Sequence, residues 1–205
     1  MNIDQQPVRA RFGETNILNT FLTPCNPDIQ SIYSNLTAGL NSVRERVAAL
    51  WAWVANIPYT PHVAVRLSAG KKSIYQNDFW AFPAETVQLG IGNCFNKSTL
   101  LCSLLMNDSS IRSKVILGNL NSDGIGGHAW SLADIEGKSY YLEATQPKLQ
   151  NPFIDPSKAS IYAPVMSFNE SGTEYLGGQL LEPLGLCCVK WLEDYLSNCY
   201  CTEYI

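Results

Sequence analysis

Three side chains in the middle of the chain have the types, and the order, that nucleophilic catalysis by a thiol requires. Cys94 follows two nearby glycines, His128 follows a glycine-rich stretch, and Glu143 stands near the end of the next extended segment. A thiolate can attack a carbonyl carbon, an imidazole can accept and return a proton, and a carboxylate can orient the imidazole. The three residues are therefore a candidate nucleophile, base and acid, provided that the fold brings them together.

The spacing around Cys94 predicts that this residue opens a buried helix. Gly90 and Gly92 allow the backbone to approach closely, and Asn93 can cap the helix. The body of the helix is apolar, with Leu100, Leu101, Leu104 and Leu105. Free N–H groups and the helix macrodipole favour the thiolate over the thiol at such a position. The alternative is that Cys94 is a small buried side chain without chemistry, the usual environment of a free cysteine.

His128 and Glu143 fall in a predicted β-hairpin. The extended segments 126–135 and 138–145 are joined by Glu136-Gly137, which is typical of a two-residue turn. If Ile135 faces Lys138 across this turn, the register of the two strands is fixed along their whole length. The hairpin therefore predicts which side chains share a face.

With this register, Trp130 lies opposite Glu143, and His128 lies one diagonal step away on the same face. A carboxylate there could orient the imidazole, favour one tautomer and stabilise the imidazolium. The alternative is an ordinary strand histidine and a solvated charge at a strand edge.

Short motifs around these residues resemble the core of the transglutaminase-like superfamily. They are Gly92-Asn93-Cys94 at the head of a leucine-rich helix, His128-Ala129-Trp130 at the start of a strand, and Tyr141–Thr145 at the end of the next strand. The segment Asp78–Thr86 also resembles the approach to the cysteine in microbial members. The resemblance extends from Ile57 to Thr145, and the ordered combination of cysteine, histidine and acid is its most specific part.

The resemblance implies an α+β fold of the papain/transglutaminase type, with the Cys94 helix packed on an antiparallel sheet that contributes His128 and Glu143. It assigns Cys94 as nucleophile, His128 as general base and Glu143 as acidic orienter. Two positions depart from the family pattern. The family commonly has Asp where this chain has Asn93, and most often Asp where it has Glu143, a change that keeps the charge and lengthens the side chain.

Trp80 and Gln88 lie just upstream of the cysteine and are candidates for the oxyanion hole or the rim of the site. Either side chain could donate an N–H to an oxyanion beside the backbone N–H of Cys94. Relatives in the superfamily use an upstream aromatic N–H in this role. His62, the other histidine of the chain, is interpreted as a surface loop residue.

The chemistry implied is thiol-dependent acyl transfer at an amide bond of a protein or peptide, through a thioester and without a cofactor. Release to water would make the protein a cysteine peptidase or amidase, and release to a lysine amine would make it a cross-linking transglutaminase. We favour hydrolysis, because water is always present and nothing marks an amine site. The departures at Asn93 and Glu143 motivate a further alternative, a non-catalytic binding module of the same fold.

The elements that position these residues fit one domain over residues 1–205. Residues 1–56 form an N-terminal segment with two helices, 57–145 form the catalytic core, and 146–205 form a C-terminal wrap with a short helix. A chain in which 46% of the residues are hydrophobic is long enough to bury one sizeable core.

Hydrophobic spacing predicts both N-terminal helices. One begins near Asp28, and the second follows a cap at Asn41-Ser42. Trp51 and Trp53 fall in the second helix, where aromatic side chains are usually core. Residues 57–82 contain two prolines in a polar stretch and are interpreted as a long connection with little regular structure.

The segments that follow the predicted Cys94 helix differ in their predicted secondary structure. Residues 114–120 indicate a buried strand, and 146–182, rich in Pro, Gly, Ser and Asn, indicate irregular structure with short strands. Residues 184–205 contain a short amphipathic helix flanked by Cys187-Cys188 and by the pair Cys199 and Cys201. Structural zinc usually takes ligand pairs two to four residues apart, so these cysteines match poorly and no metal is expected.

Charge and composition argue against several classes of partner. The net charge of -4, a sequence pI near 5.2 and the lack of a basic stripe argue against nucleic acid. No stretch reaches the roughly 18 apolar residues of a membrane span, and the first residues lack the regions of a signal peptide. We therefore expect a cytoplasmic protein, or one exported by another route. The cysteines number 7, an odd count without the spacing of a disulfide scaffold.

Overall fold

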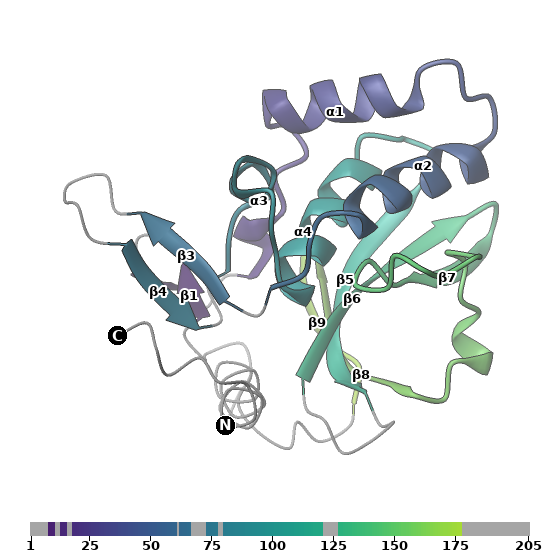
Figure 1. Ribbon diagram of the computed structural model, residues 1–205. Coiled ribbons are helices and arrows are strands. Elements are labelled where there is room, and N and C mark those ends of the chain that lie inside the picture. The colour runs from purple at the N-terminus through teal and green to yellow at the C-terminus, as the bar shows by residue number, and fades with distance from the viewer. Residues whose placement is uncertain are drawn as a thin grey trace.

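The computed structural model (Figure 1) describes residues 8–10, 13–15, 18–60, 62–66, 73–77, 80–120 and 127–177. Side chains are described for 18–60, 80–120 and 127–177. The helices are α1 (Pro27–Thr37), α2 (Val43–Ala55), α3 (Pro83–Leu89) and α4 (Cys94–Leu105), with 3-10 helices at Leu18–Phe21 and Pro156–Lys158. The strands are β1 (Val8–Ala10), β2 (Gly13–Thr15), β3 (His62–Arg66), β4 (Ser73–Asn77), β5 (Arg112–Leu120), β6 (Gly127–Ile135), β7 (Lys138–Leu142), β8 (Tyr162–Asn169) and β9 (Gly172–Tyr175).

Five antiparallel strands form the main sheet, in the spatial order β7-β6-β5-β8-β9. Helix α4 packs on β5 and β6, and α2 packs on α4 (Figure 1). Strands β1 and β2 form a separate two-stranded sheet, and β3 and β4 form another. A helical layer on an antiparallel sheet is an α+β architecture, which confirms the predicted fold class.

Helix α4 is the buried helix that the spacing around Cys94 predicts, and all of its residues are buried. The core around it combines leucines of α4 with side chains of α2 and of the sheet, among them Leu100, Leu101, Leu104, Leu105, Val47, Leu50, Val54, Ile135 and Leu142. Full burial of one leucine stabilises a fold by about 1.5–3 kcal/mol. These leucines therefore fix the position of the helix that begins at Cys94.

The two N-terminal helices are confirmed, and their caps explain where they begin. The side chain of Asn26 accepts hydrogen bonds from the first turn of α1. Ser42 and Glu45 form a capping box at the start of α2. Trp51 is buried in the core and Trp53 packs against it, so both tryptophans are core residues as predicted.

The hairpin of β6 and β7 has the predicted register, with Ile135 paired to Lys138 and Ser131 paired to Leu142. Glu136 and Gly137 have φ angles of 53° and 79°. Positive φ at both turn residues matches the right-handed twist of the strands, and Gly137 adopts this backbone conformation without strain. Residue 143 follows β7 directly, beside the end of the ladder.

The interpretation of residues 57–82 as a connection with little regular structure is wrong. Residues 62–66 and 73–77 pair as the antiparallel strands β3 and β4, so His62 begins a strand and not a loop. Both strands are short and contain β-branched residues between polar flanks, a signal that the prolines and lysines nearby obscured. Helix α3 was also missed, although Pro83 at its start and Gly90 after its end are typical helix boundaries.

The segment after β7 contains the expected short strands, and they extend the main sheet. Strand β8 pairs with β5, and β9 pairs with β8. Ile154 forms an isolated bridge with Tyr141, so the chain between β7 and β8 packs onto the hairpin. The predicted helix and cysteines of 184–205 lie outside the described residues. Within the described ranges, the helices are too short or too polar to cross a bilayer.

Candidate active site

Cys94 is the first residue of α4, as predicted. Asn93 has an extended backbone and caps the helix, because its side-chain oxygen accepts a 2.9 Å hydrogen bond from the backbone N–H of Asn96. Only 7% of Cys94 is exposed to solvent. The thiol thus lies at the positive end of a buried helix, where an anion is stabilised.

The chain reaches Cys94 through a tightly packed approach. Gly90 ends α3 in the left-handed region with φ of 65°. The N–H of Gly92 donates to the carbonyl of Pro58, and the N–H of Thr60 donates to the carbonyl of Gly92. A Cβ atom on Gly92 would lie 3.2 Å from side-chain atoms of Asn96, so a glycine fits best here. The residues before the thiol are therefore fixed by backbone pairing.

His128 and Glu143 meet as the hairpin register predicts. His128 Nε2 lies 2.7 Å from Oε2 of Glu143, and their side chains are 11% and 2% exposed. The Cys94 side chain lies close enough to His128 to raise the pKa of its imidazole. Because Nε2 faces the carboxylate, the imidazole has Nδ1 left for the thiol. The structure thus brings the three candidate residues together.

The charges at the site stabilise one another. Burial alone lowers the pKa of His128, but the Glu143 carboxylate and the contact with Cys94 outweigh it and raise this pKa to about 10. Burial alone raises the pKa of Glu143, but the His128 charge and hydrogen bonds from His128 and Thr145 bring it below its usual range. An imidazolium beside a carboxylate is the favoured state at neutral pH.

Both oxygens of the Glu143 carboxylate are held by further donors. Oε1 accepts hydrogen bonds from the backbone N–H of Thr145 at 2.8 Å and from its hydroxyl at 2.6 Å. Oε2 accepts a 3.1 Å hydrogen bond from the hydroxyl of Tyr162 in addition to its contact with His128. The indole N–H of Trp51 donates to the backbone carbonyl of Glu143 at 2.9 Å. The acid is therefore anchored from α2, from β8 and from the turn that follows β7.

A buried lysine lies one turn after the nucleophile. Lys97 is 1% exposed, and its ammonium donates to the carbonyls of Ala55 at 3.0 Å and Ile57 at 2.8 Å. Burial lowers the pKa of Lys97 to about 8, although the charge of Glu143 acts in the opposite direction. Lys97 joins the first turn of α4 to the end of α2.

The two oxyanion candidates occupy different surroundings. Trp80 is 3% exposed and stacks on the ring of Phe95, the residue after the nucleophile, with centroids 3.6 Å apart. Gln88 lies in α3 and is exposed. The backbone N–H of Ala81 donates to the side chain of Asn96, which ties the Trp80 segment to α4. An oxyanion role for either side chain stays a prediction.

Sequence reasoning missed the residues that support the acid and the nucleophile. Trp51 was assigned to the core alone, and Tyr162 and Lys97 had no assigned role. A lysine three residues after the candidate nucleophile, in a helix expected to be buried, was the one available signal. Tyr162 had no local signal, because its contact with Glu143 depends on how β8 enters the sheet.

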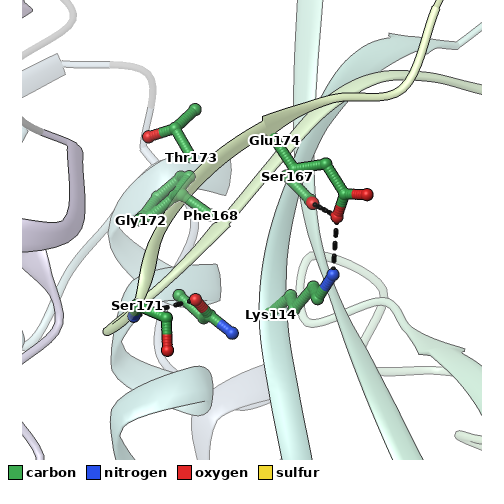
Figure 2. Close-up of a pocket in the computed structure, with 8 residues that line it drawn as sticks. Lys114, Ser167, Phe168, Ser171, Gly172, Thr173 and Glu174 are labelled. Atoms are coloured by element: carbon green, nitrogen blue, oxygen red, sulfur yellow. Dashed lines mark hydrogen bonds and ion pairs between the residues drawn. The ribbon is translucent and has the colours of Figure 1, made fainter.

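A pocket of about 260 Å³ lies elsewhere, at the turn between β8 and β9. Its lining includes Lys114 and Glu174, which point toward one another and form a 2.7 Å ion pair (Figure 2). Both charges are therefore partnered. None of the three candidate catalytic residues lines this pocket.

Comparisons with known proteins give matches among solved structures alone. No protein-family model and no curated protein matches the chain. Legionella pneumophila LapG is 14% identical with a TM-score of 0.52, covering 86% of this chain and 93% of LapG. A calcium-bound structure of LapG is 15% identical with a TM-score of 0.50, covering 82% of this chain and 90% of LapG.

A candidate cysteine protease from Cytophaga hutchinsonii is 17% identical with a TM-score of 0.44, and the match covers 80% of this chain and 55% of that protein. The similarity to LapG concerns the fold, since so low an identity does not transfer an activity. Together with the observed helix-on-sheet architecture, it shows that the chain shares the fold of LapG.

Proposed function

We propose that this protein is a cysteine-dependent enzyme that cleaves amide bonds of proteins or peptides through a thioester on Cys94. The proposal rests on one observation: His128 Nε2 lies 2.7 Å from the Glu143 carboxylate, and the Cys94 side chain is near enough to raise the pKa of the same imidazole. A structural histidine needs no nucleophile beside it. An imidazolium held by a carboxylate stabilises a thiolate and can deliver a proton to a leaving group.

The first half of the reaction forms the thioester. The Cys94 sulfur attacks the amide carbon, and the electrons of the C=O bond move to the oxygen to give a tetrahedral oxyanion. The oxyanion collapses, the C–N bond breaks, and the leaving amine takes a proton from His128. The backbone N–H of Cys94, at the start of α4, is suited to bind the oxyanion.

The second half releases the product and restores the enzyme. A water molecule gives a proton to neutral His128 and attacks the thioester carbon. The C–S bond then breaks, which yields a carboxylic acid and returns the thiolate and the imidazolium. Glu143 keeps its charge throughout and holds the Nε2 side of the ring. A primary amine that replaces water at this stage gives transamidation, so the acceptor alone separates hydrolase from transglutaminase.

The test follows the fate of the acyl group. Wild-type protein and Cys94→Ala are incubated with a peptide library that contains glutamine, with and without a fluorescent primary amine. Mass spectrometry then measures new peptide termini, conversion of glutamine to glutamate, and incorporation of the amine. We expect new termini or glutamate with the wild type and neither with Cys94→Ala.

Amine incorporation that exceeds hydrolysis would assign the protein as a transglutaminase, with the same thioester. If the wild type and Cys94→Ala give the same products as the buffer control, acyl transfer is contradicted. A folded but inactive protein of that kind would support the binding module. Circular dichroism of both proteins shows whether they are folded.

A further inference from the structure

The Glu143 carboxylate stands at the end of a long side chain, so keeping it in one orientation requires restraint. Rotation about the last bond of a glutamate is nearly free, because this torsion has a broad energy profile. In this structure four donor groups reach the two oxygens of Glu143. Two of the donors belong to the neighbouring Thr145, and one belongs to Tyr162, which lies far along the chain.

We propose that Tyr162 is a positioning residue, whose hydroxyl fixes the Glu143 carboxylate in the orientation that holds His128 against Cys94. The proposal deepens the proposed function, on which its catalytic meaning rests. The hydroxyl lies 3.1 Å from Oε2, the same oxygen that is 2.7 Å from His128 Nε2. Thr145 restrains the other oxygen, so the two residues together prevent rotation of the carboxylate.

Tyr162 is itself held in place, as a positioning residue must be. Its ring lies 5.0 Å from that of Trp130 and 5.6 Å from that of Tyr141, in an edge or tilted geometry. The backbone of Tyr162 pairs with Leu120 in β5, and its N–H donates to the carbonyl of Ala159. Ring and backbone are therefore both fixed, and the hydroxyl has one position relative to Glu143.

The hydroxyl of Tyr162 also remains a donor across the working pH range. Burial and the neighbouring Glu143 charge raise its pKa above the ordinary value for tyrosine. A charge-assisted hydrogen bond of this kind is stronger than one between neutral groups. Loss of the hydroxyl therefore removes one restraint on Oε2 of Glu143 without removing the ring from the core.

The chain offers a matched control in Tyr141. Its ring lies 5.6 Å from that of Trp130, and 7% of the residue is exposed. Removal of its hydroxyl subtracts one oxygen from the same aromatic cluster and leaves every donor to Glu143 in place. Tyr141→Phe and Tyr162→Phe thus differ in whether the lost hydroxyl contacts the acid.

The experiment compares these two variants by two measurements that need no substrate. Proton NMR detects the His128 Nε2–H that is bonded to Glu143, and the chain has only 2 histidines, so assignment is direct. Alkylation by limiting iodoacetamide gives the rate at Cys94 relative to exposed Cys25. In Tyr162→Phe we expect the Nε2–H signal to broaden or vanish and the relative rate to fall about tenfold. Tyr141→Phe keeps the signal and a rate within about twofold of wild type.

A second variant keeps the proposal testable if Tyr162→Phe folds poorly. Thr145→Val removes the hydroxyl donor to Oε1 but leaves the backbone donor, and we expect a smaller loss of the same kind. An unchanged Nε2–H signal and unchanged alkylation in folded Tyr162→Phe would overturn the positioning role. Neither measurement requires turnover, so failure to find an amide substrate would contradict the proposed function alone.

Discussion

Two pairs of an acidic and a basic side chain have similar contact distances but different roles. His128 and Glu143 meet at 2.7 Å beside the nucleophile, and Arg46 and Asp108 meet at 2.6 Å where α2 contacts the turn after α4. Both acids are almost fully buried. The two pairs differ in the nitrogens and exchangeable protons that the basic side chain has available once it is bound to the acid.

Arg46 has no proton to exchange and no thiol to act on. Its remaining nitrogens donate to the carbonyl of Asn41 and the hydroxyl of Ser110, while Asp108 also accepts from Ser110. A guanidinium stays protonated at any physiological pH, so the pair joins two elements and does nothing further. An imidazole can release and take back a proton at one nitrogen while the other stays bound to the acid. His128 therefore can pass a proton where Arg46 cannot.

The largest expected effect is on activity, when the acid of each pair is replaced by its amide. Glu143→Gln removes the charge that stabilises the imidazolium, so amide cleavage should fall about 10²- to 10⁴-fold. Asp108→Asn should leave cleavage within about twofold and lower the free energy of unfolding by about 1–3 kcal/mol. Initial rates and urea unfolding of both variants test this. Equal losses of activity would show that the two pairs do not differ as described.

Substitution of Gly118 should disturb the histidine from the neighbouring strand. Gly118 pairs with His128, and a Cβ atom there would lie 2.2 Å from the carbonyl oxygen of Ala163 and 2.7 Å from the Trp130 ring. Gly118→Ala should therefore lower the free energy of unfolding by about 2–3 kcal/mol and also reduce activity. Urea unfolding measures the first effect. A variant as stable as wild type would mean that this region repacks freely.

Lys97 is a buried basic side chain, and its hydrogen bonds go to backbone carbonyls and not to an acid. Lys97→Met leaves the carbonyls of Ala55 and Ile57 without their donor and should lower the free energy of unfolding by about 1–2 kcal/mol. The pKa of Lys97 is lowered from 10.5 to about 8, so between these values the unfolded chain binds more protons. Its contribution to stability therefore rises with pH in this window. Urea unfolding at several pH values should show this rise in wild type and a smaller one in Lys97→Met.

The smallest effect is expected at the capping box of α2, far from the chemistry. Ser42→Ala removes the side-chain acceptor for the N–H of Glu45 and should cost about 1 kcal/mol of stability. Activity should stay within about twofold of wild type. Thermal unfolding and initial rates check both. A marked loss of activity would link α2 to the site more tightly than the contact through Trp51 suggests.

Local signals predicted the parts of the site that depend on neighbours in sequence. The cap at Asn93, the buried leucines of α4 and the register that pairs Ile135 with Lys138 all follow from short patterns. The register alone was enough to place His128 and Glu143 on one face. The core motif was therefore visible before the fold was known.

The rest depends on contacts between distant segments. Tyr162 reaches Glu143 only because β8 enters the sheet beside β5, and no local pattern specifies that strand order. Strands β3 and β4 were missed because short strands between prolines and lysines give weak periodicity. The Arg46 and Asp108 pair likewise joins elements that only the packing of α2 on α4 brings together.

The stability of the His128 and Glu143 pair has a defined pH window. The pKa of His128 is raised from 6.5 to about 10, so its contribution to stability is full below pH 6.5 and is lost as the pH rises through about 10. The pKa of Glu143 is lowered from 4.5, so its contribution is present above pH 4.5 and is lost as the pH falls through its folded value. The ion pair should therefore persist across neutral pH.

The most direct test of the central claim, that Cys94 is a nucleophile activated by His128, is alkylation of the native protein. Limiting iodoacetamide is applied from about pH 5 to about pH 9, and mass spectrometry maps the adducts in wild type and His128→Ala. We predict that Cys94, although buried, reacts faster than exposed Cys25 at the acidic end, and that His128→Ala abolishes this advantage. If Cys94 reacts no faster than Cys25 at any pH, or only after denaturation, the claim is contradicted.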